Sequence, residues 1–81
     1  MASKVAVIAI IVERGSSVEG INGLLHEYSE YVVGRMGVPY RNKGINIISV
    51  AVDAPEETID ELARKINALE GISSNTVCSV G

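Results

Sequence analysis

The stretch "KVAVIAIIVE", Lys4 to Glu13, decides how this chain of 81 residues folds. Both of its alternating sets of side chains are apolar, so a β-strand built from it must be covered on both faces. Its many β-branched residues favour a strand. We therefore expect a buried central strand here rather than the apolar part of a signal peptide, because the run is short and lacks a small-residue cleavage motif.

Two regions farther along the chain have apolar residues at helical spacing. The first helix is expected to begin at Ser16, with Glu19 completing a capping box, and to end near Glu30. The second helix is expected to begin after Asp53 as its N-cap and to end at Gly71. Three further stretches have strand character: residues 31–36, 44–53 and 72–80.

The resulting order of elements is β-α-β-β-α-β. Right-handed connections between them give a fold of the α+β class, a ferredoxin-like βαββαβ sandwich. In that fold the antiparallel four-stranded sheet has the order 4-1-3-2, and both helices lie on one face. The two most apolar stretches, residues 4–13 and 44–53, then form the central strands. We expect residues 1–81 to form one such domain, because the chain is too short for a second core.

The two faces of the expected sheet are not equally covered, because both helices lie on the same side. In a monomer, one set of side chains, Val5, Val7, Ala9 and Ile11 or their alternates, would face water. A large exposed apolar surface usually marks an interface. One Cys and one His also leave little scope for a disulfide or a zinc site to stabilise so small a domain. We therefore expect a homo-oligomer, a dimer or tetramer closed by sheet faces or edges.

Composition and charge argue against several functions. The formal net charge is −3, and basic residues cluster only at Arg35, Arg41 and Lys43, with Arg14 as a further candidate, so direct nucleic-acid binding is not expected. No segment has the roughly 20 consecutive apolar residues of a membrane span, and we expect a cytoplasmic protein. The sequence has no catalytic Ser–His–Asp arrangement, GxGxxG motif or P-loop, so we do not expect an enzyme. It identifies no cofactor.

The stretch "GRMGVPYRNKG", Gly34 to Gly44, contains three of the seven basic residues and no acid. We expect it to leave the end of a short strand and to form a long hairpin loop. Arg35 lies between two glycines, and its planar guanidinium suits the binding of a carboxylate or phosphate. Pro39 fixes the loop, and Tyr40 can stack on a ligand or form a hydrogen bond with it. The alternative is that these charges only keep a sheet edge soluble.

Two further residues have more than one interpretation. His26 lies in the middle of the first expected helix, with Glu30 one turn on, and is a ligand contact, a metal ligand or an ordinary surface histidine. Cys78 lies in the last expected strand, where we expect a buried, unreactive thiol.

The motifs "LLHEYSE" and "GRMGVPYR", with the helix end "ALEGI", resemble the regulators of the iron-only hydrogenase system. That family is ACT-like and similar to the C-terminal domain of nickel-responsive regulators, and the resemblance covers nearly the whole chain. It implies a ferredoxin-like fold, homo-oligomers, a regulatory rather than catalytic role, and a small ligand bound at a subunit interface. The residues that fall in the matching motifs are His26, Arg35, Gly37, Pro39 and Arg41.

The leading hypothesis is a non-enzymatic sensor that binds a small anionic ligand between copies of the chain. Its ligand contacts would be His26, Arg35, Gly37, Pro39, Tyr40 and Arg41. The alternatives are a metal-responsive regulator that uses His26, and a ligand-free module that binds a protein partner. The nickel-binding pattern is not matched, because the chain has one His and one Cys, far apart in sequence. We expect any effect on transcription to require a partner.

Overall fold

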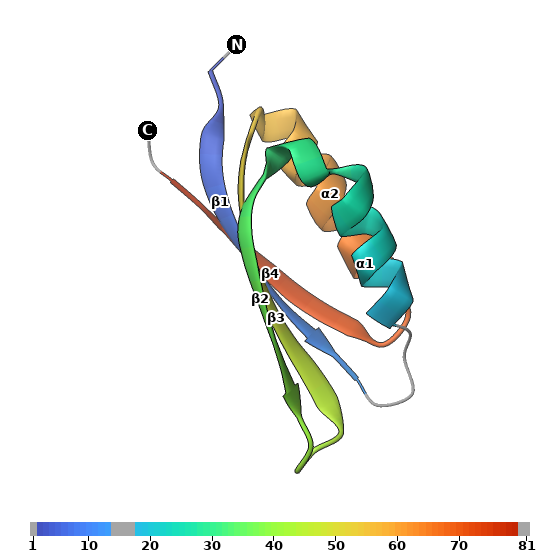
Figure 1. Ribbon diagram of the computed structural model, residues 1–81. Helices are drawn as coiled ribbons and strands as arrows, with labels where there is room; N and C mark the ends of the chain where they lie inside the picture. The colour runs from blue at the N-terminus through green and yellow to red at the C-terminus, as the bar shows by residue number, and fades with distance from the viewer. Residues whose placement is uncertain (1, 14–17, 80–81) are drawn as a thin grey trace.

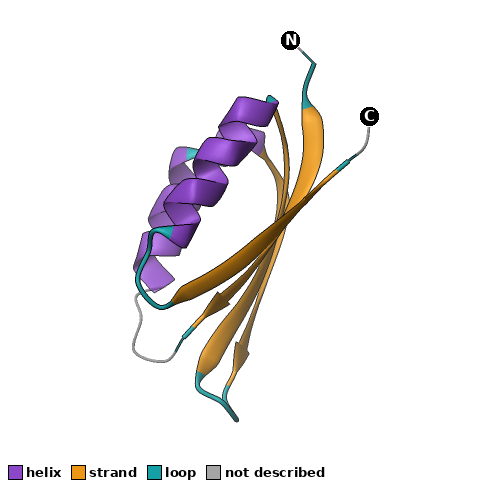
Figure 2. Ribbon diagram, turned by 180° about the vertical axis from the view of Figure 1, so that it is seen from behind, coloured by secondary structure: helices purple, strands orange, loops and turns teal. Residues whose placement is uncertain are grey.

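The computed structural model describes residues 2–13 and 18–79 (Figure 1). In chain order the elements are β1 (Lys4–Val12), α1 (Val18–Glu27), a 3₁₀ turn (Ser29–Tyr31), β2 (Val32–Tyr40), β3 (Ile45–Ala54), α2 (Glu56–Asn67) and β4 (Ile72–Cys78). The strands form one sheet in the order β2-β3-β1-β4, and every neighbouring pair is antiparallel. This is the expected order 4-1-3-2 read from the other edge. Both helices lie on one face of the sheet (Figure 2), so the predicted α+β ferredoxin-like fold is confirmed.

The core lies between the helices and the face of the sheet that they cover. On β1, alternate residues are buried, with Ile8 fully inaccessible, and the facing residues of β3 include Val50, which is also fully inaccessible. From the helices, Ile21 and Ile66 reach the same core. Each large aliphatic side chain buried in this way contributes about 1.5–3 kcal/mol to folding. The period of two along the strands and the helical spacing of the apolar residues therefore determine which face becomes the core.

The helix boundaries differ from those expected. The first helix ends at Glu27 rather than near Glu30, because the chain tightens into the 3₁₀ turn, where the amide N–H of Tyr31 donates to the carbonyl of Tyr28 at 2.9 Å. The expected cap at Ser16 lies outside the described residues. Asp53 does not cap the second helix, because it belongs to β3.

The N-cap residue of α2 is Pro55 rather than Asp53. Pro55 occupies the N-cap position of α2 without a side-chain hydrogen bond, and two acidic residues follow in the first turn. At its other end the helix stops at Asn67, and Gly71 lies in the turn that follows, with a φ of 75°. The helix therefore ends before Gly71, where its end was expected, and Gly71 adopts the left-handed conformation a few residues farther on.

The strand expected at residues 31–36 is longer than predicted. β2 continues to Tyr40, and its residues from Gly37 to Tyr40 pair with β3 instead of forming a loop. Pro39 is tolerated because β2 is an edge strand, with β3 as its single partner. The connection between the strands is only the short turn Arg41–Gly44, in which Gly44 has a φ of 66°.

The face of the sheet opposite the helices is apolar and uncovered. We call it the open face. The strand registers and the alternation of side chains place on it the exposed large side chains Val5, Val7, Ile11, Met36, Val38, Tyr40, Ile47 and Val77. The prediction that a single chain leaves one apolar sheet face in contact with water is confirmed. That the chain forms a homo-oligomer stays a prediction.

β4 forms the other edge of the sheet and carries the cysteine. Cys78 is exposed, so the expectation of a buried thiol is wrong. It is the last residue of an edge strand, opposite Ala6 near the start of β1, and only one neighbouring strand borders it. The helices in the described part of the chain include none that is long and apolar enough to cross a membrane.

Candidate functional site

A groove of about 390 Å³ opens between α1 and β2. The residues that line it are Asn22, Leu25, His26, Ser29, Val32 and Arg35. Its polar groups come from a helix, a 3₁₀ turn and a strand, so the groove exists only once the chain has folded. Two residues predicted separately as ligand contacts, His26 and Arg35, line this one groove.

The helical wall of the groove is built by residues four apart in sequence. Asn22 and His26 lie one turn apart on the same side of α1, and Ser29 follows in the 3₁₀ turn. Leu25, which is 3% exposed, fixes this wall to the core. Leu25 and Val32 also give the groove an apolar floor, next to which the polar side chains are exposed.

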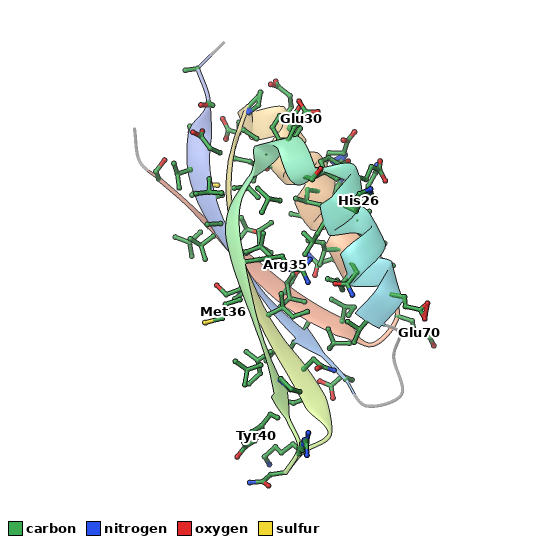
Figure 3. All side chains as sticks on the ribbon, viewed as in Figure 1. His26, Glu30, Arg35, Met36, Tyr40 and Glu70 are labelled. Atoms are coloured by element: carbon green, nitrogen blue, oxygen red, sulfur yellow. The ribbon has the colours of Figure 1, made fainter. Side chains whose placement is uncertain are left out.

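Arg35 reaches the groove from β2. It pairs with Val50, whose side chain is buried under the helices, so Arg35 lies on the helix side of the sheet. Figure 3 shows Arg35 directed towards α1, whereas Met36 and Tyr40 point to the opposite side. The Nη2 atom of Arg35 donates a hydrogen bond to Oδ1 of Asn22 at 2.7 Å. That bond joins the strand to the helix across the groove and orients the guanidinium.

The groove has one formal charge, which is positive. Among the described residues that line it, Arg35 is the one charged side chain and no carboxylate is present. The two ion pairs within the described ranges lie elsewhere, between Lys4 and Glu56 and between Lys65 and Glu27. Since a guanidinium has five N–H donors and the structure shows one of them bonded to Asn22, Arg35 retains donors for an anion.

The remaining predicted contacts lie farther along the β2–β3 hairpin. Gly37 and Pro39 follow Arg35 on the same strand, opposite Ile48 and Asn46, and do not line the groove. Tyr40 points to the open face (Figure 3), and Arg41 lies in the turn at the end of the hairpin.

Asn22 and Ser29 were not predicted as site residues. Asn22 precedes His26 by four positions, and this helical spacing was the available signal. Ser29 gave no comparable signal, because it lies beyond the end of α1.

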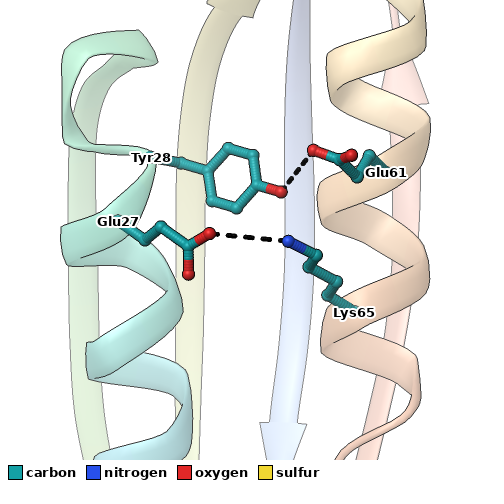
Figure 4. A network of polar contacts seen from close by, with 4 residues as sticks. All are labelled: Glu27, Tyr28, Glu61 and Lys65. Atoms are coloured by element: carbon teal, nitrogen blue, oxygen red, sulfur yellow. Dashed lines mark hydrogen bonds and ion pairs between the residues drawn. The ribbon is translucent and has the colours of Figure 1, made fainter.

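A polar network holds α1 against α2 behind the groove wall (Figure 4). The hydroxyl of Tyr28 donates to Oε1 of Glu61 at 2.5 Å, and Nζ of Lys65 lies 3.5 Å from Oε2 of Glu27 and 5.2 Å from the centre of the Tyr28 ring. The hydrogen bond to Glu61 raises the pKa of Tyr28, because it stabilises the protonated hydroxyl beside a carboxylate. The pKa of Lys65 is also raised, first by its interaction with Tyr28.

The described residues contain no group of three or more His, Cys, Asp and Glu side chains that could hold a metal ion. His26 therefore has no such set of ligands within residues 2–13 and 18–79.

Comparison with known families gives a match over residues 4–76 to the TM1266-like family, described as "Iron-only hydrogenase system regulator, putative". The chain belongs to this family. The match confirms the resemblance that the motifs around His26 and Arg35 indicated. A search of curated proteins found no relative of this chain.

Two solved structures extend the comparison. The uncharacterised protein TM1266 from Thermotoga maritima is similar with a TM-score of 0.89 and 30% identity, over 94% of this chain and 96% of that one. A formyltetrahydrofolate deformylase from Pseudomonas putida KT2440 is similar with a TM-score of 0.64 and 18% identity, over 90% of this chain and 28% of the enzyme. The second likeness shows the fold alone, since the identity is low.

Proposed function

We propose that this chain is a regulatory domain without catalytic activity that binds a small anionic ligand in the groove between α1 and β2. The observation that carries the proposal is that His26, from the helix, and Arg35, from the strand, line the same groove. The description of the family as a regulator supports the regulatory role. A guanidinium binds a carboxylate or phosphate through two parallel hydrogen bonds, so Arg35 would hold the charged end of the ligand.

The other residues of the groove would position the ligand. Asn22 orients Arg35 through the 2.7 Å hydrogen bond, and His26 and Ser29 would form hydrogen bonds with further oxygen atoms. Leu25 and Val32 offer apolar contact to the carbon part of the ligand. A volume of about 390 Å³ suits a small organic anion, because pockets for small molecules begin at roughly 300 Å³.

Binding would act on the assembly of the protein in the cytoplasm. The groove opens beside β2, an edge strand, so a second copy or a partner protein packed near this edge would lie close to the ligand. A ligand that contacts one arrangement better than another shifts the equilibrium towards it. An effect on transcription would follow through such a partner.

The test is isothermal titration calorimetry with sodium succinate and with inorganic phosphate as probes, at constant ionic strength set with chloride. Arg35→Ala should weaken binding about tenfold or more, because a charged hydrogen bond contributes roughly 1.5–3 kcal/mol. Arg41→Ala removes the same charge from the hairpin turn, outside the groove, and should leave the affinity within about a factor of three. If the wild-type protein binds neither probe saturably, or if both variants lose affinity equally, the proposal is wrong.

A further inference from the structure

We infer that the open face of the sheet binds the same face of a second copy, with a two-fold axis that runs along the strands and places Met36 of each copy in a hollow of the other. This inference does not depend on the ligand groove, which lies on the helix side of the sheet. It rests on the composition, the size and the shape of the open face.

The composition of the open face is that of an interface core. Of the described strand residues that the register places on this face, Asp53 alone is charged, and it lies near one end, opposite Val5. Among the described residues, this face carries eight large apolar side chains that are 40–71% exposed in the single chain, while the small residues Ala9 and Ser49 lie at its centre. Cores of protein interfaces are depleted of charged residues in the same way.

The size of the face suits a dimer of modest area. A strand spacing of about 4.8 Å and a rise of about 3.3 Å per residue give the four strands a flat area on the order of 600 Å² per copy. Two such faces together reach the lower part of the range for specific interfaces, roughly 1,200–2,000 Å² of total buried surface. A second copy can therefore cover the whole apolar face without help from another element.

Pairing along the β2 edge is hindered, which favours contact through the face. Pro39 lies in this edge strand and has no amide hydrogen to donate to an added strand. Proline on an edge strand is a common means by which proteins prevent extension of a sheet.

The shape of the open face supplies both a projection and a hollow. On the β2 side, Met36 is 64% exposed. On the other side, a hollow of about 210 Å³ is lined by Ala9, Ile11, Ser73, Ser74 and Asn75. The registers place projection and hollow at the same level of the sheet, because Met36 pairs with Ser49, Ser49 with Ala9, and Ala9 with Asn75.

A two-fold axis along the strands would bring these two features together. Such an axis places β2 of one copy over β4 of the other and keeps each residue at its own level. Met36 would then enter the hollow beside the partner's Ala9 and the partner's Asn75. Methionine is well suited to this role, because its flexible side chain fills irregular gaps. An axis across the strands would instead place the β2 strands of the two copies over each other. Met36 would then not meet the hollow, which lies between β1 and β4.

The geometry is tested by cysteine cross-linking of the full chain in a Cys78→Ser background. Met36→Cys combined with Asn75→Cys should give a covalent dimer with a short bismaleimide cross-linker, whereas either substitution alone should give none. A cross-linker is needed because sheets packed face to face lie about 10 Å apart, beyond the reach of a disulfide. Within one chain the two positions lie on opposite edges of the sheet, and a link between them would not give a covalent dimer. Cross-linking of the single Met36→Cys variant, or none in the double variant, would overturn the arrangement.

A second variant tests the contact without cross-linking. Ala9→Lys fills the hollow with a charged side chain at an exposed position and should convert the dimer into a monomer in sedimentation velocity. Glu57→Lys introduces the same side chain at an exposed position of α2, on the other side of the sheet, and should leave the dimer intact. Circular dichroism should confirm that both variants fold. A wild-type protein that remains a monomer, or an Ala9→Lys variant that remains a dimer, would contradict the inference.

Discussion

At the scale of single residues, Arg35 is the main anion-binding residue of the proposed site, because its neighbours in the groove are uncharged. The guanidinium is bonded to the neutral Asn22 and has no ion pair with a carboxylate in the described part of the chain. Its positive charge is therefore not neutralised within the groove. Sequence reasoning identified Arg35 from its glycine neighbours, and His26 from its family motif. It did not identify Asn22, because the contact between these two residues depends on how α1 lies against β2.

The role of Asn22 gives the first prediction. Asn22→Asp replaces the neutral acceptor with a carboxylate, which pairs with Arg35 and competes with an incoming anion. The affinity for succinate should fall further in Asn22→Asp than in Asn22→Ala, and both can be measured by isothermal titration calorimetry. If Asn22→Asp binds succinate as tightly as the wild-type protein, the charge of Arg35 does not determine binding.

At the scale of elements, β2 shows where sequence patterns mislead. Gly37 and Pro39 are typical of turns, and the sequence therefore predicted a loop after Met36. The sheet overrides that local preference, because β2 pairs with β3 as an edge strand, and an edge strand tolerates a proline. The long apolar strands and the helix stripes were predictable because their periodicity is strong and agrees with their burial.

The contact between α1 and α2 gives the second prediction. The folded protein holds the protons of Tyr28 and Lys65 more tightly than the unfolded chain, since both pKa values are raised. The stabilisation from these two groups is therefore complete below about pH 10, the pKa of an unperturbed tyrosine, and is lost as the pH rises through the folded-state values. Urea unfolding should show a fall in the free energy of unfolding as the pH rises above about pH 10, smaller in Tyr28→Phe than in the wild-type protein. An equal fall in both proteins would assign the effect to other groups.

At the scale of the whole molecule, β2 connects the two proposed binding surfaces. Arg35 faces the groove, and its neighbour Met36 faces the open side of the sheet (Figure 3). The alternation of side chains along one strand thus places a ligand contact and an interface contact next to each other. The strand order and the uncovered face followed from the sequence, because two helices cannot cover both faces of four strands. The projection and the hollow did not, since they depend on the register across all four strands.

Two isoleucines on β1 give the third prediction. Ile8→Ala should lower the free energy of unfolding by about 2–5 kcal/mol at every protein concentration, because Ile8 is fully buried in the core. Ile11, on the open face, is 40% exposed in the single chain. Ile11→Ala should therefore destabilise the protein chiefly at concentrations at which the wild-type chains associate. A large loss for Ile11→Ala that is independent of concentration would place this residue in a monomer core.

The most direct test of the proposed function is a nuclear magnetic resonance titration of the ¹⁵N-labelled wild-type protein and its Arg35→Ala variant with sodium succinate, against sodium chloride at equal ionic strength. The wild-type protein should show saturable shifts of the Arg35 Nε–H, the Asn22 side-chain amide and the His26 ring signals. The Arg35→Ala variant should show no saturable shift of the Asn22 and His26 signals. If succinate and chloride have the same effect on the wild-type signals, or if the variant responds to succinate as the wild-type protein does, the groove between α1 and β2 is not the anion site.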